Sequence, residues 1–332
     1  MSGFSDTILR WYAACGRDLP WRHTRDPYPV WLSEVILQQT RIAQGTAYWQ
    51  RFLTRFPRVE DLAAASEDEV LRLWQGLGYY SRARNLHAAA RQVVAQGGFP
   101  RTLEGIRALK GVGDYTAAAI GSICFGLPAA VVDGNVYRVL ARYFGLETPV
   151  GSNQARKEFS ALAQRLLPPE DPAAFNQGMM DFGALQCTPQ HPDCPGCPLA
   201  QSCNALRTGR VQLLPVKQAA PQVQERHFSY VYLRFQGETA IRQRGPGDIW
   251  QGLWEPLVPP PGRFAAKLRL IKKGVKHQLT HRTLVVDFYL WEPEERPQLP
   301  EGYVWVKEAE LDKYAKPRLF ERLTEEIPKV FL

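Results

Sequence analysis

Apolar residues recur at the three- and four-residue spacing of amphipathic helices through roughly the first 200 positions of the chain. The alanine-rich stretches EDEVLRLWQGL, RARNLHAAARQVVAQ and YTAAAIGSICFG show this pattern most clearly. Short breaks rich in Gly and Pro separate the helical stretches, at GLGYY, QGGFP, LKGVGD and FGLP. We therefore predict a mainly α-helical domain over residues 1–206.

The pattern of polar and apolar positions changes after residue 206. The stretch RTGRVQLLPVKQAAPQVQ is typical of a linker, which we assign to residues 207–224. Alternating apolar and polar residues then predict β-strands at HFSYVYLRF, TAIRQR, RTLVVDFYLW and GYVWV. The last stretch, PRLFERLTEEI, returns to helical spacing. Residues 225–332 should therefore form a smaller α+β domain.

Length and composition agree with two folded domains. The 332 residues exceed the roughly 250–300 residues that one hydrophobic core usually serves. The chain has no apolar run near the ~20 residues that a membrane span needs. Its polar start, MSGFSDTILR, does not resemble a signal peptide. We expect a cytoplasmic protein with no membrane partner.

The charge of the chain favours a polyanionic partner, because the formal net charge is +8 and the pI is about 9.2. One stretch of the predicted second domain carries basic residues and no acidic residue: Arg263, Lys267, Arg269, Lys272, Lys273, Lys276 and Arg282. Such a run is usually a solvated face, and the alternative is a strip that faces phosphates.

Four of the six cysteines are clustered in CTPQHPDCPGCPLAQSC, with the spacing C-x6-C-x2-C-x5-C: Cys187, Cys194, Cys197 and Cys203. Four thiolates in a short irregular loop can bind a zinc ion or a 4Fe–4S cluster, and the spacing alone leaves both open. The other two, Cys15 and Cys124, lie in apolar, helix-like surroundings, so we predict that they are small core residues.

The helical stretch WLSEVILQQT carries one carboxylate, Glu34. The residues three and four positions away are Val30, Trp31, Leu37 and Gln38, which puts Glu34 on an apolar side of the helix. A carboxylate on such a face is costly unless it is paired, protonated or used chemically. Position alone leaves open a buried acid that is satisfied by a local donor.

Two further motifs are candidates for binding and catalysis. In LKGVGDYTAAAI, Gly111 and Gly113 permit a tight turn between two helices, and the start of the second helix can hold a phosphate. This is the helix–hairpin–helix pattern. In VVDGNVYR, Asp133 precedes a helical run, so its ordinary role is to cap that helix; facing a nucleic-acid sugar is the alternative.

Taken together, these motifs resemble the endonuclease III superfamily of DNA glycosylases, and within it the MutY-type adenine glycosylases. The resemblance covers nearly all of residues 5–205. It is carried by LPWR, PYPVWLSEVILQQT, GLGYYSRARNLH, LKGVGDYTAAAI, VVDGNVYRVLAR and the cysteine loop. It implies base excision of adenine opposite 8-oxoguanine or guanine in duplex DNA, by a monomer in the bacterial cytosol that associates with the nucleoid when engaged. It also implies a 4Fe–4S cluster on the four cysteines, at 187–203.

The resemblance assigns catalytic roles to four residues. Glu34 would be the general acid that protonates N7 of a flipped adenine, and Asp133 would stabilise the oxocarbenium-like sugar. Asn135 and Tyr115 match positions that support Asp133 and the sugar. Lyase-competent relatives have a lysine where Tyr115 stands, so we expect a monofunctional enzyme. Asp181 falls where a supporting acid is expected, although aspartate is the shorter of the two acidic side chains.

The remaining implied contacts are to substrate and DNA. Gln39, Leu77 and Tyr79 match wedge and plug positions that fill the gap left by a flipped base. The full set implied to bind substrate or DNA is Arg17, Trp21, Arg22, Gln39, Thr40, Leu77, Tyr79, Gly111, Gly113 and Thr280.

The second domain resembles the Nudix-like module of the family, which reads 8-oxoguanine. GDIWQGLWEPL fits this module, whereas the acidic REXXEE core of Nudix hydrolases is missing from the sequence. The family usually has Phe-Ser-His in its recognition loop, and this chain has Leu279, Thr280 and His281. Two rivals are a thymine- or uracil-excising glycosylase on the same scaffold and a non-catalytic DNA-binding module with a structural metal.

Overall fold

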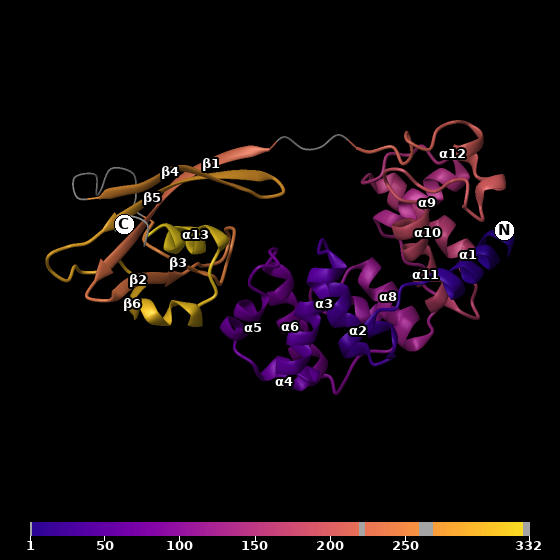
Figure 1. Ribbon diagram of the computed structural model, residues 1–332. Helices are drawn as coiled ribbons and strands as arrows, with labels where there is room; N and C mark the ends of the chain where they lie inside the picture. The colour runs from indigo at the N-terminus through magenta and orange to yellow at the C-terminus, as the bar shows by residue number, and fades with distance from the viewer. Residues whose placement is uncertain (1, 219–222, 259–267, 328–332) are drawn as a thin grey trace. The chain divides into compact units, whose positions relative to one another are not determined.

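The computed structural model describes residues 2–218, 223–258 and 268–327 (Figure 1). Arg263 and Lys267 of the basic stretch, part of the predicted linker and the last residues of the predicted second domain lie outside these ranges. The chain divides into two compact units, Met1–Glu60 with Ala88–Ala219, and Asp61–His87 with Ala220–Leu332. Residues 61–87 thus pack with the C-terminal part of the chain, although they belong to the helical stretch of the sequence.

The first unit is helical, as the periodicity predicts. Its helices are α1 (Ser2–Cys15), η1 (Pro20–Arg22), α2 (Pro27–Ile36), α3 (Ile42–Arg55), α7 (Leu103–Arg107), α8 (Asp114–Phe125), α9 (Gly134–Phe144), α10 (Asn153–Leu166), α11 (Pro172–Asp181), the π-helical turn η2 (Phe182–Gln186), η3 (Ala200–Ser202) and α12 (Asn204–Arg207). In the part of the chain that the structure describes, no helix is long and apolar enough to cross a membrane.

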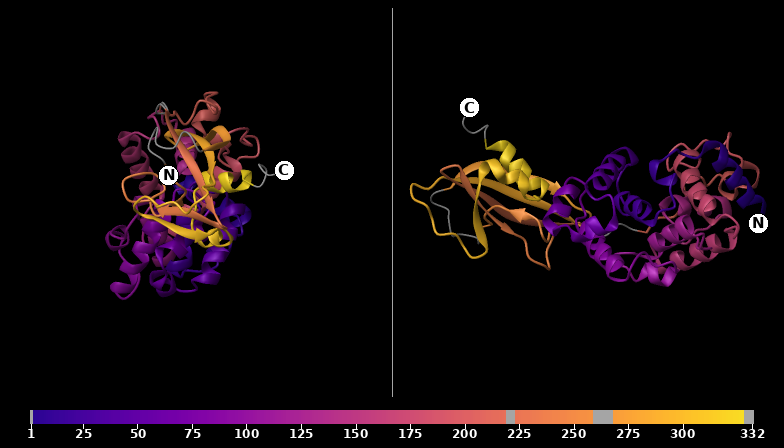
Figure 2. Two further views of the ribbon diagram at one scale, coloured as in Figure 1. Left: turned by 90° about the vertical axis from the view of Figure 1, so that its left-hand side faces the viewer. Right: turned by 90° about the horizontal axis from the view of Figure 1, so that it is seen from below.

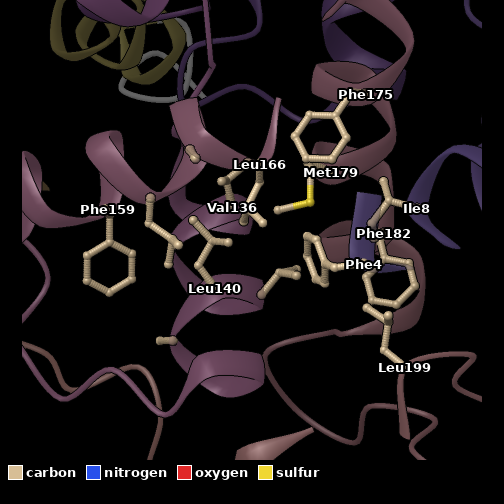
Figure 3. Packing of buried hydrophobic residues seen from close by; sticks show 14 of the residues in the cluster. Phe4, Ile8, Val136, Leu140, Phe159, Leu166, Phe175, Met179, Phe182 and Leu199 are labelled. Atoms are coloured by element: carbon tan, nitrogen blue, oxygen red, sulfur yellow. The ribbon is translucent and has the colours of Figure 1, made fainter. Parts of the chain in front are cut away.

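One core of this unit joins the N-terminal helix to the later helices. Phe4 and Ile8 of α1 pack with Val136 of α9 and with Phe175 and Met179 of α11 (Figure 3). Arg142 of α9 connects this unit to the predicted linker. Its Nε donates a 3.0 Å hydrogen bond to the carbonyl of the buried Leu214. Residues just after α12 are therefore anchored on the helical unit.

Helix α2 is set by local signals at both ends. Asp26 caps its start by accepting a hydrogen bond from the Tyr28 amide, and Pro27 occupies the first turn, where a missing N–H costs nothing. The helix ends at Ile36, and Gln39 adopts a left-handed φ of 57°. The stretch WLSEVILQQT is therefore a helix followed by a turn, and the turn carries Gln39 and Thr40.

The second unit contains a six-stranded sheet and a covering helix. The strands are β1 (Gln224–Phe235), β2 (Glu238–Gln243), β3 (Trp254–Glu255), β4 (Arg269–Gln278), β5 (Arg282–Trp291) and β6 (Tyr303–Lys307). Their order is β3-β2-β1-β5-β4, with β6 on β2; β1 and β5 are parallel and the other pairs antiparallel. Helix α13 (Arg318–Glu326) packs against β1 and β4, after the short helix η4 (Glu308–Lys313) (Figure 2).

Helices from the earlier part of the sequence complete the second unit. They are most of α4 (Val59–Ala64), α5 (Glu67–Trp74) and the start of α6 (Ser81–Ala95). Gln243 of β2 donates a 2.9 Å hydrogen bond to Asp68, and the Lys316 amide donates one of 3.1 Å to Gln75. The predicted fold class, a mainly helical domain followed by a smaller α+β domain, is confirmed.

One strand was not predicted from the sequence, and one expectation is wrong. The basic stretch 269–278 was not among the predicted strands, yet it forms the edge strand β4 with two register shifts; charged side chains on an edge discourage pairing with other chains. Cys15 is exposed rather than a core residue, because it is the last residue of α1 and the helix has left the core there. Cys124 is half-buried.

Candidate active site and cysteine loop

A cavity of about 790 Å³ in the first unit is lined by residues from η1, α2, α8, α9 and α11. It brings together nine residues that the sequence analysis singled out: Arg17, Trp21, Arg22, Glu34, Gln39, Thr40, Tyr115, Asp133 and Asn135. These positions span more than a hundred residues of sequence. A cavity of this size with a few convergent polar groups has the character of a small-molecule or base-binding site.

Glu34 is one of two carboxyl groups that line this cavity, with Asp133. Burial raises the pKa of its carboxyl to about 7, against the opposing effect of a 2.9 Å hydrogen bond donated by the Tyr115 hydroxyl. The negative charge of Asp133 raises the Glu34 pKa further, and the guanidinium of Arg22 lowers it. A carboxyl with a pKa near 7 is partly protonated at neutral pH, so Glu34 can donate a proton there.

Asp133 caps helix α9, which is its ordinary role. Oδ1 accepts hydrogen bonds from the amides of Asn135 (2.9 Å) and Val136 (2.8 Å), and Oδ2 accepts one of 2.8 Å from the Asn135 side chain. Burial raises the pKa of Asp133 above its ordinary value, while these donors lower it. Three hydrogen bonds to a single carboxylate fix its orientation in the cavity.

Arg138, one turn further along α9, connects this carboxylate to the cysteine loop. Its Nη2 donates to Asn135 Oδ1 at 2.8 Å and to the Gly183 carbonyl at 2.6 Å, and its Nε donates to the Cys187 carbonyl at 2.7 Å. Gly183 lies so close to Asn135 that a Cβ there would be 2.6 Å from the Asn135 Cβ. Arg138 was not predicted as a site residue, although its i+3 spacing from Asn135 on a helix was a usable signal.

Asp181 lies behind the cavity rather than in its lining, and its side chain is fully buried. Arg17 binds it through its amide at 2.8 Å and through its guanidinium, and Arg22 binds both of its oxygens at 2.7 and 2.8 Å. These donors hold the pKa of Asp181 below its ordinary value, against the effect of burial. The Asp181 carboxylate therefore orients two arginines that line the cavity.

Two residues of α11, Gln177 and Met180, also line the cavity, and sequence reasoning missed both. Gln177 accepts a 2.6 Å hydrogen bond from the Tyr12 hydroxyl, and the Met180 sulfur is 3.5 Å from the Tyr115 hydroxyl. Methionine and glutamine on an apolar helix indicate packing more often than chemistry, so the sequence carries no distinct signal for them.

The hairpin glycines lie between α7 and α8. Gly111 has a φ of +75°, a conformation that favours glycine, whereas Gly113 is extended and caps α8. Both glycines are exposed. Because neither glycine has a side chain, the backbone at these two positions before α8 is open to approach by a phosphate.

Leu77, Tyr79 and Thr280 line a separate cavity of about 720 Å³ within the second unit. The hydroxyls of Tyr79 and Thr280 share a hydrogen bond. Tyr79 is 47% exposed and has a φ of +46°, which is strained for a residue with a large side chain. Trp250 and His277, whose rings are 5.8 Å apart, also line the cavity and were not predicted.

The four clustered cysteines line one small cavity of about 30 Å³, together with Arg142. The Arg142 guanidinium donates to the Cys187 sulfur at 3.4 Å and to the carbonyls of Thr188 and Pro189 at 2.7 and 3.1 Å. Among the described residues, no three His, Cys, Asp or Glu side chains form a site for a single metal ion. Four convergent thiols with a neighbouring cation are nevertheless a donor set that fits a thiolate-bound cluster.

The first unit thus combines a hairpin between helices, two carboxylates in one cavity and a four-cysteine loop. The model of the HhH-GPD superfamily of base excision DNA repair proteins matches residues 32–169, and a NUDIX domain model matches residues 229–326. The structure of a thermostable thymine-DNA glycosylase is similar, with a TM-score of 0.58 and 35% identity over 62% of this chain and 96% of that chain. A trapped endonuclease III–DNA intermediate has a TM-score of 0.54 and 25% identity over 62% and 94%.

Adenine DNA glycosylases are among the similar curated proteins. That of Buchnera aphidicola (Schizaphis graminum) is 35% identical over 76% of this chain and 73% of its own length. The human protein is 45% identical over 64% of this chain and 41% of its own, and the mouse protein is 43% identical over 68% and 46%. This chain thus spans less than half the length of these mammalian relatives. The chain belongs to the MutY-type adenine DNA glycosylase family.

Proposed function

We propose that this protein is a monofunctional adenine DNA glycosylase. It hydrolyses the N-glycosidic bond of adenine paired with 8-oxoguanine or guanine in duplex DNA. The observation that carries the proposal is the pairing of Glu34, with a pKa of about 7, and the capped Asp133 in one cavity. Two carboxyls with different environments are what an acid-assisted glycosidic cleavage needs.

In the proposed reaction, protonated Glu34 donates its proton to N7 of an adenine that has rotated out of the duplex. The bond between C1′ and N9 then breaks, and its electron pair leaves with the neutral base. The ionised carboxylate of Asp133 stabilises the positive charge on the sugar. Water adds to C1′, and its proton passes to a carboxylate of the site. Asn135 and Arg138 hold Asp133 in orientation through the bonds described above.

Tyr115 supports the absence of a lyase step. Its phenol lies in the cavity and donates to Glu34, and its pKa is raised well above the ordinary value by burial. A neutral phenol cannot form a Schiff base with the opened sugar, whereas a lysine amine at this position can. The DNA strand should therefore stay intact after base release.

Several groups are proposed to hold and open the duplex. Gly111 and Gly113 would place backbone amides against a phosphate. The exposed Gln39 and Tyr79 would enter the space left by the flipped base, and Leu77, which is buried, would have to move out of its packing to do so. Gln39 and Tyr79 share a left-handed backbone conformation, and neither residue lies in a helix. Arg17, Trp21, Arg22 and Thr40 would line the adenine pocket.

The second domain is proposed to read the base opposite adenine. Thr280 has a hydroxyl that can hydrogen-bond 8-oxoguanine, and its bond to Tyr79 brings the proposed reader and plug together. Without the REXXEE core, nucleotide hydrolysis by this domain is not proposed. The basic residues of β4 are proposed to face phosphates; Lys272 is already paired with Glu326 at 2.9 Å, which leaves Lys273 and Lys276 as the better candidates.

Cys187, Cys194, Cys197 and Cys203 are proposed to bind a 4Fe–4S cluster. When bound, such a cluster would fix the loop that contains its four ligands. Arg138 and Arg142 tie that loop to α9, whose first turn carries Asp133 and Asn135. Loss of the cluster would therefore affect the catalytic carboxylate as well as the loop.

One assay tests the proposal against its rivals. Purified protein is incubated with duplexes that carry each mispair, and free base and strand breaks are measured separately. Release of adenine opposite 8-oxoguanine and guanine, with intact strands, supports the proposal. Release of thymine or uracil instead would favour the mismatch glycosylase that the similarity to a thymine-DNA glycosylase suggests. Binding without release of any base would favour a non-catalytic module.

A further inference from the structure

The turn that carries Leu77 and Tyr79, here called the plug turn (residues 75–80), has an unusual backbone. Gly76 and Gly78 have φ values of +98° and +71°, and Tyr79 adopts +46°. A non-glycine residue in this region costs on the order of 1–3 kcal/mol unless its surroundings enforce the conformation. Leu77 is buried while the Tyr79 ring is half-exposed, so packing of Tyr79 in a core does not hold the turn.

Arg82, at the start of α6, lies near two aromatic rings, one in the plug turn and one just before it. Its guanidinium lies 5.6 Å from the centre of the Tyr79 ring and 5.0 Å from that of Trp74, which is fully buried at the end of α5. Both distances are within the range of a cation–π interaction. Burial lowers the pKa of Arg82 to about 10, so the guanidinium remains charged at neutral pH.

The same guanidinium also binds the backbone of the plug turn. Its Nη2 donates long hydrogen bonds of 3.4 Å to the carbonyls of Leu77 and Gly78. Trp74 adds a 2.9 Å bond from its indole nitrogen to the Gly78 carbonyl. A planar group with several donors can serve two rings and two carbonyls at once, whereas a lysine ammonium cannot.

We infer that Arg82 is a positioning residue that preorganises the plug turn. Tyr79 can then enter the duplex with its backbone already ordered. The inference rests on the proposed function, in which Tyr79 takes the space beside the flipped base. Arg82 acts through Tyr79 and has no role in the chemistry of the Glu34 cavity. Its removal should slow opening of the duplex rather than cleavage of the glycosidic bond.

The test compares the full-length wild-type protein with Arg82→Met and Arg82→Lys, each with Tyr79 intact and with Tyr79→Ala. The duplex carries 2-aminopurine beside the target adenine, whose fluorescence rises when the base stack opens. Excision is measured under single-turnover conditions with saturating protein. Arg72→Met is the matched control, because Arg72 is exposed on α5 in the same unit.

We expect Arg82→Met and Arg82→Lys to slow both the fluorescence rise and excision by about 10- to 100-fold, the range typical of a misplaced positioning group. In the Tyr79→Ala background, both should change these rates less than about twofold, because the residue through which Arg82 acts is gone. Arg72→Met should match wild type. If Arg82→Met does not fold, Arg82→Lys provides the comparison.

Equal slowing by Arg82→Met with and without Tyr79 would overturn the inference, since a general loss of structure acts in both backgrounds. Wild-type rates for Arg82→Lys would overturn it too, because charge alone would then suffice. If wild-type protein releases no adenine, the proposed function fails. The fluorescence comparison then still decides whether Arg82 acts through Tyr79.

Discussion

The Tyr115 hydroxyl donates a 2.9 Å hydrogen bond to Oε2 of Glu34. This donor stabilises the ionised form of the carboxyl and opposes burial, which raises the Glu34 pKa to about 7. The protonated form is the proposed acid, so the two effects together set how much of the protein is active at a given pH.

The first prediction is a pH profile. Single-turnover base release should fall as pH rises through about 7, tenfold per unit, because the proton on Glu34 is lost. Tyr115→Phe removes a bond that favours the ionised form, so the Glu34 pKa should rise and this limb should move to higher pH. A limb that stays in place or moves to lower pH in Tyr115→Phe would show that Glu34 is not the titrating group.

Glu34→Gln should abolish base release and leave duplex binding intact. Glutamine keeps the shape of the side chain and cannot donate an acid proton, so the loss should be at least the roughly 10²–10⁴-fold of a missing general acid. Glu104→Gln, on the exposed face of α7, is the control and should behave like wild type. Near-normal turnover by Glu34→Gln would disprove the mechanism.

Protein purified without oxygen should be brown and contain iron rather than zinc. Cys197→Ser should reduce the iron content and weaken DNA binding, because the loop loses one of its four ligands. Cys15→Ser is the matched control, since Cys15 is an exposed thiol at the end of α1 and does not line the cavity of the four cysteines. Elemental analysis that finds stoichiometric zinc would contradict the cluster assignment.

Tyr115→Lys should introduce strand cleavage at the abasic product. The lysine amine would lie in the cavity beside Glu34 and could attack the sugar carbon, forming a Schiff base that borohydride traps. Tyr115→Phe has no amine and should give no trapped adduct. Failure to trap any adduct with Tyr115→Lys would indicate that position 115 does not face the anomeric carbon.

Thr280→Ala should narrow the preference for 8-oxoguanine over guanine opposite adenine. One neutral hydrogen bond contributes about 0.5–1.5 kcal/mol, so the expected change is roughly 2- to 10-fold. Excision rates on the two duplexes measure it, with Thr283→Ala on β5 as control. An unchanged preference would place lesion reading elsewhere. Deleting residues 226–332 would also remove the packing partners of residues 61–87, so the point variant tests lesion reading more directly.

The sequence alone predicted many of the helices and most of the strands, whereas the roles of the site residues stay predictions. Helical and alternating periodicities predicted α5, α6, α8 and the strands β1, β2, β5 and β6, because burial of one face dictates the spacing of apolar residues. Asp133 as a helix cap followed from a local rule of hydrogen bonding. Strand β4 was not predicted, because its lysines lie on an exposed sheet edge, where burial imposes little alternation of apolar and polar residues.

Tertiary structure decided what depends on contacts distant in sequence. The sequence marked Glu34 as an acid on an apolar face, but its pKa comes from burial by the fold and from Tyr115 and Asp133, which lie 81 and 99 positions away. The buried clamp on Asp181 and the bridge from Arg138 to the Cys187 carbonyl have the same origin. Local patterns report which residues are buried, whereas the partners of a buried polar group are chosen by packing between elements, which no short stretch of sequence encodes.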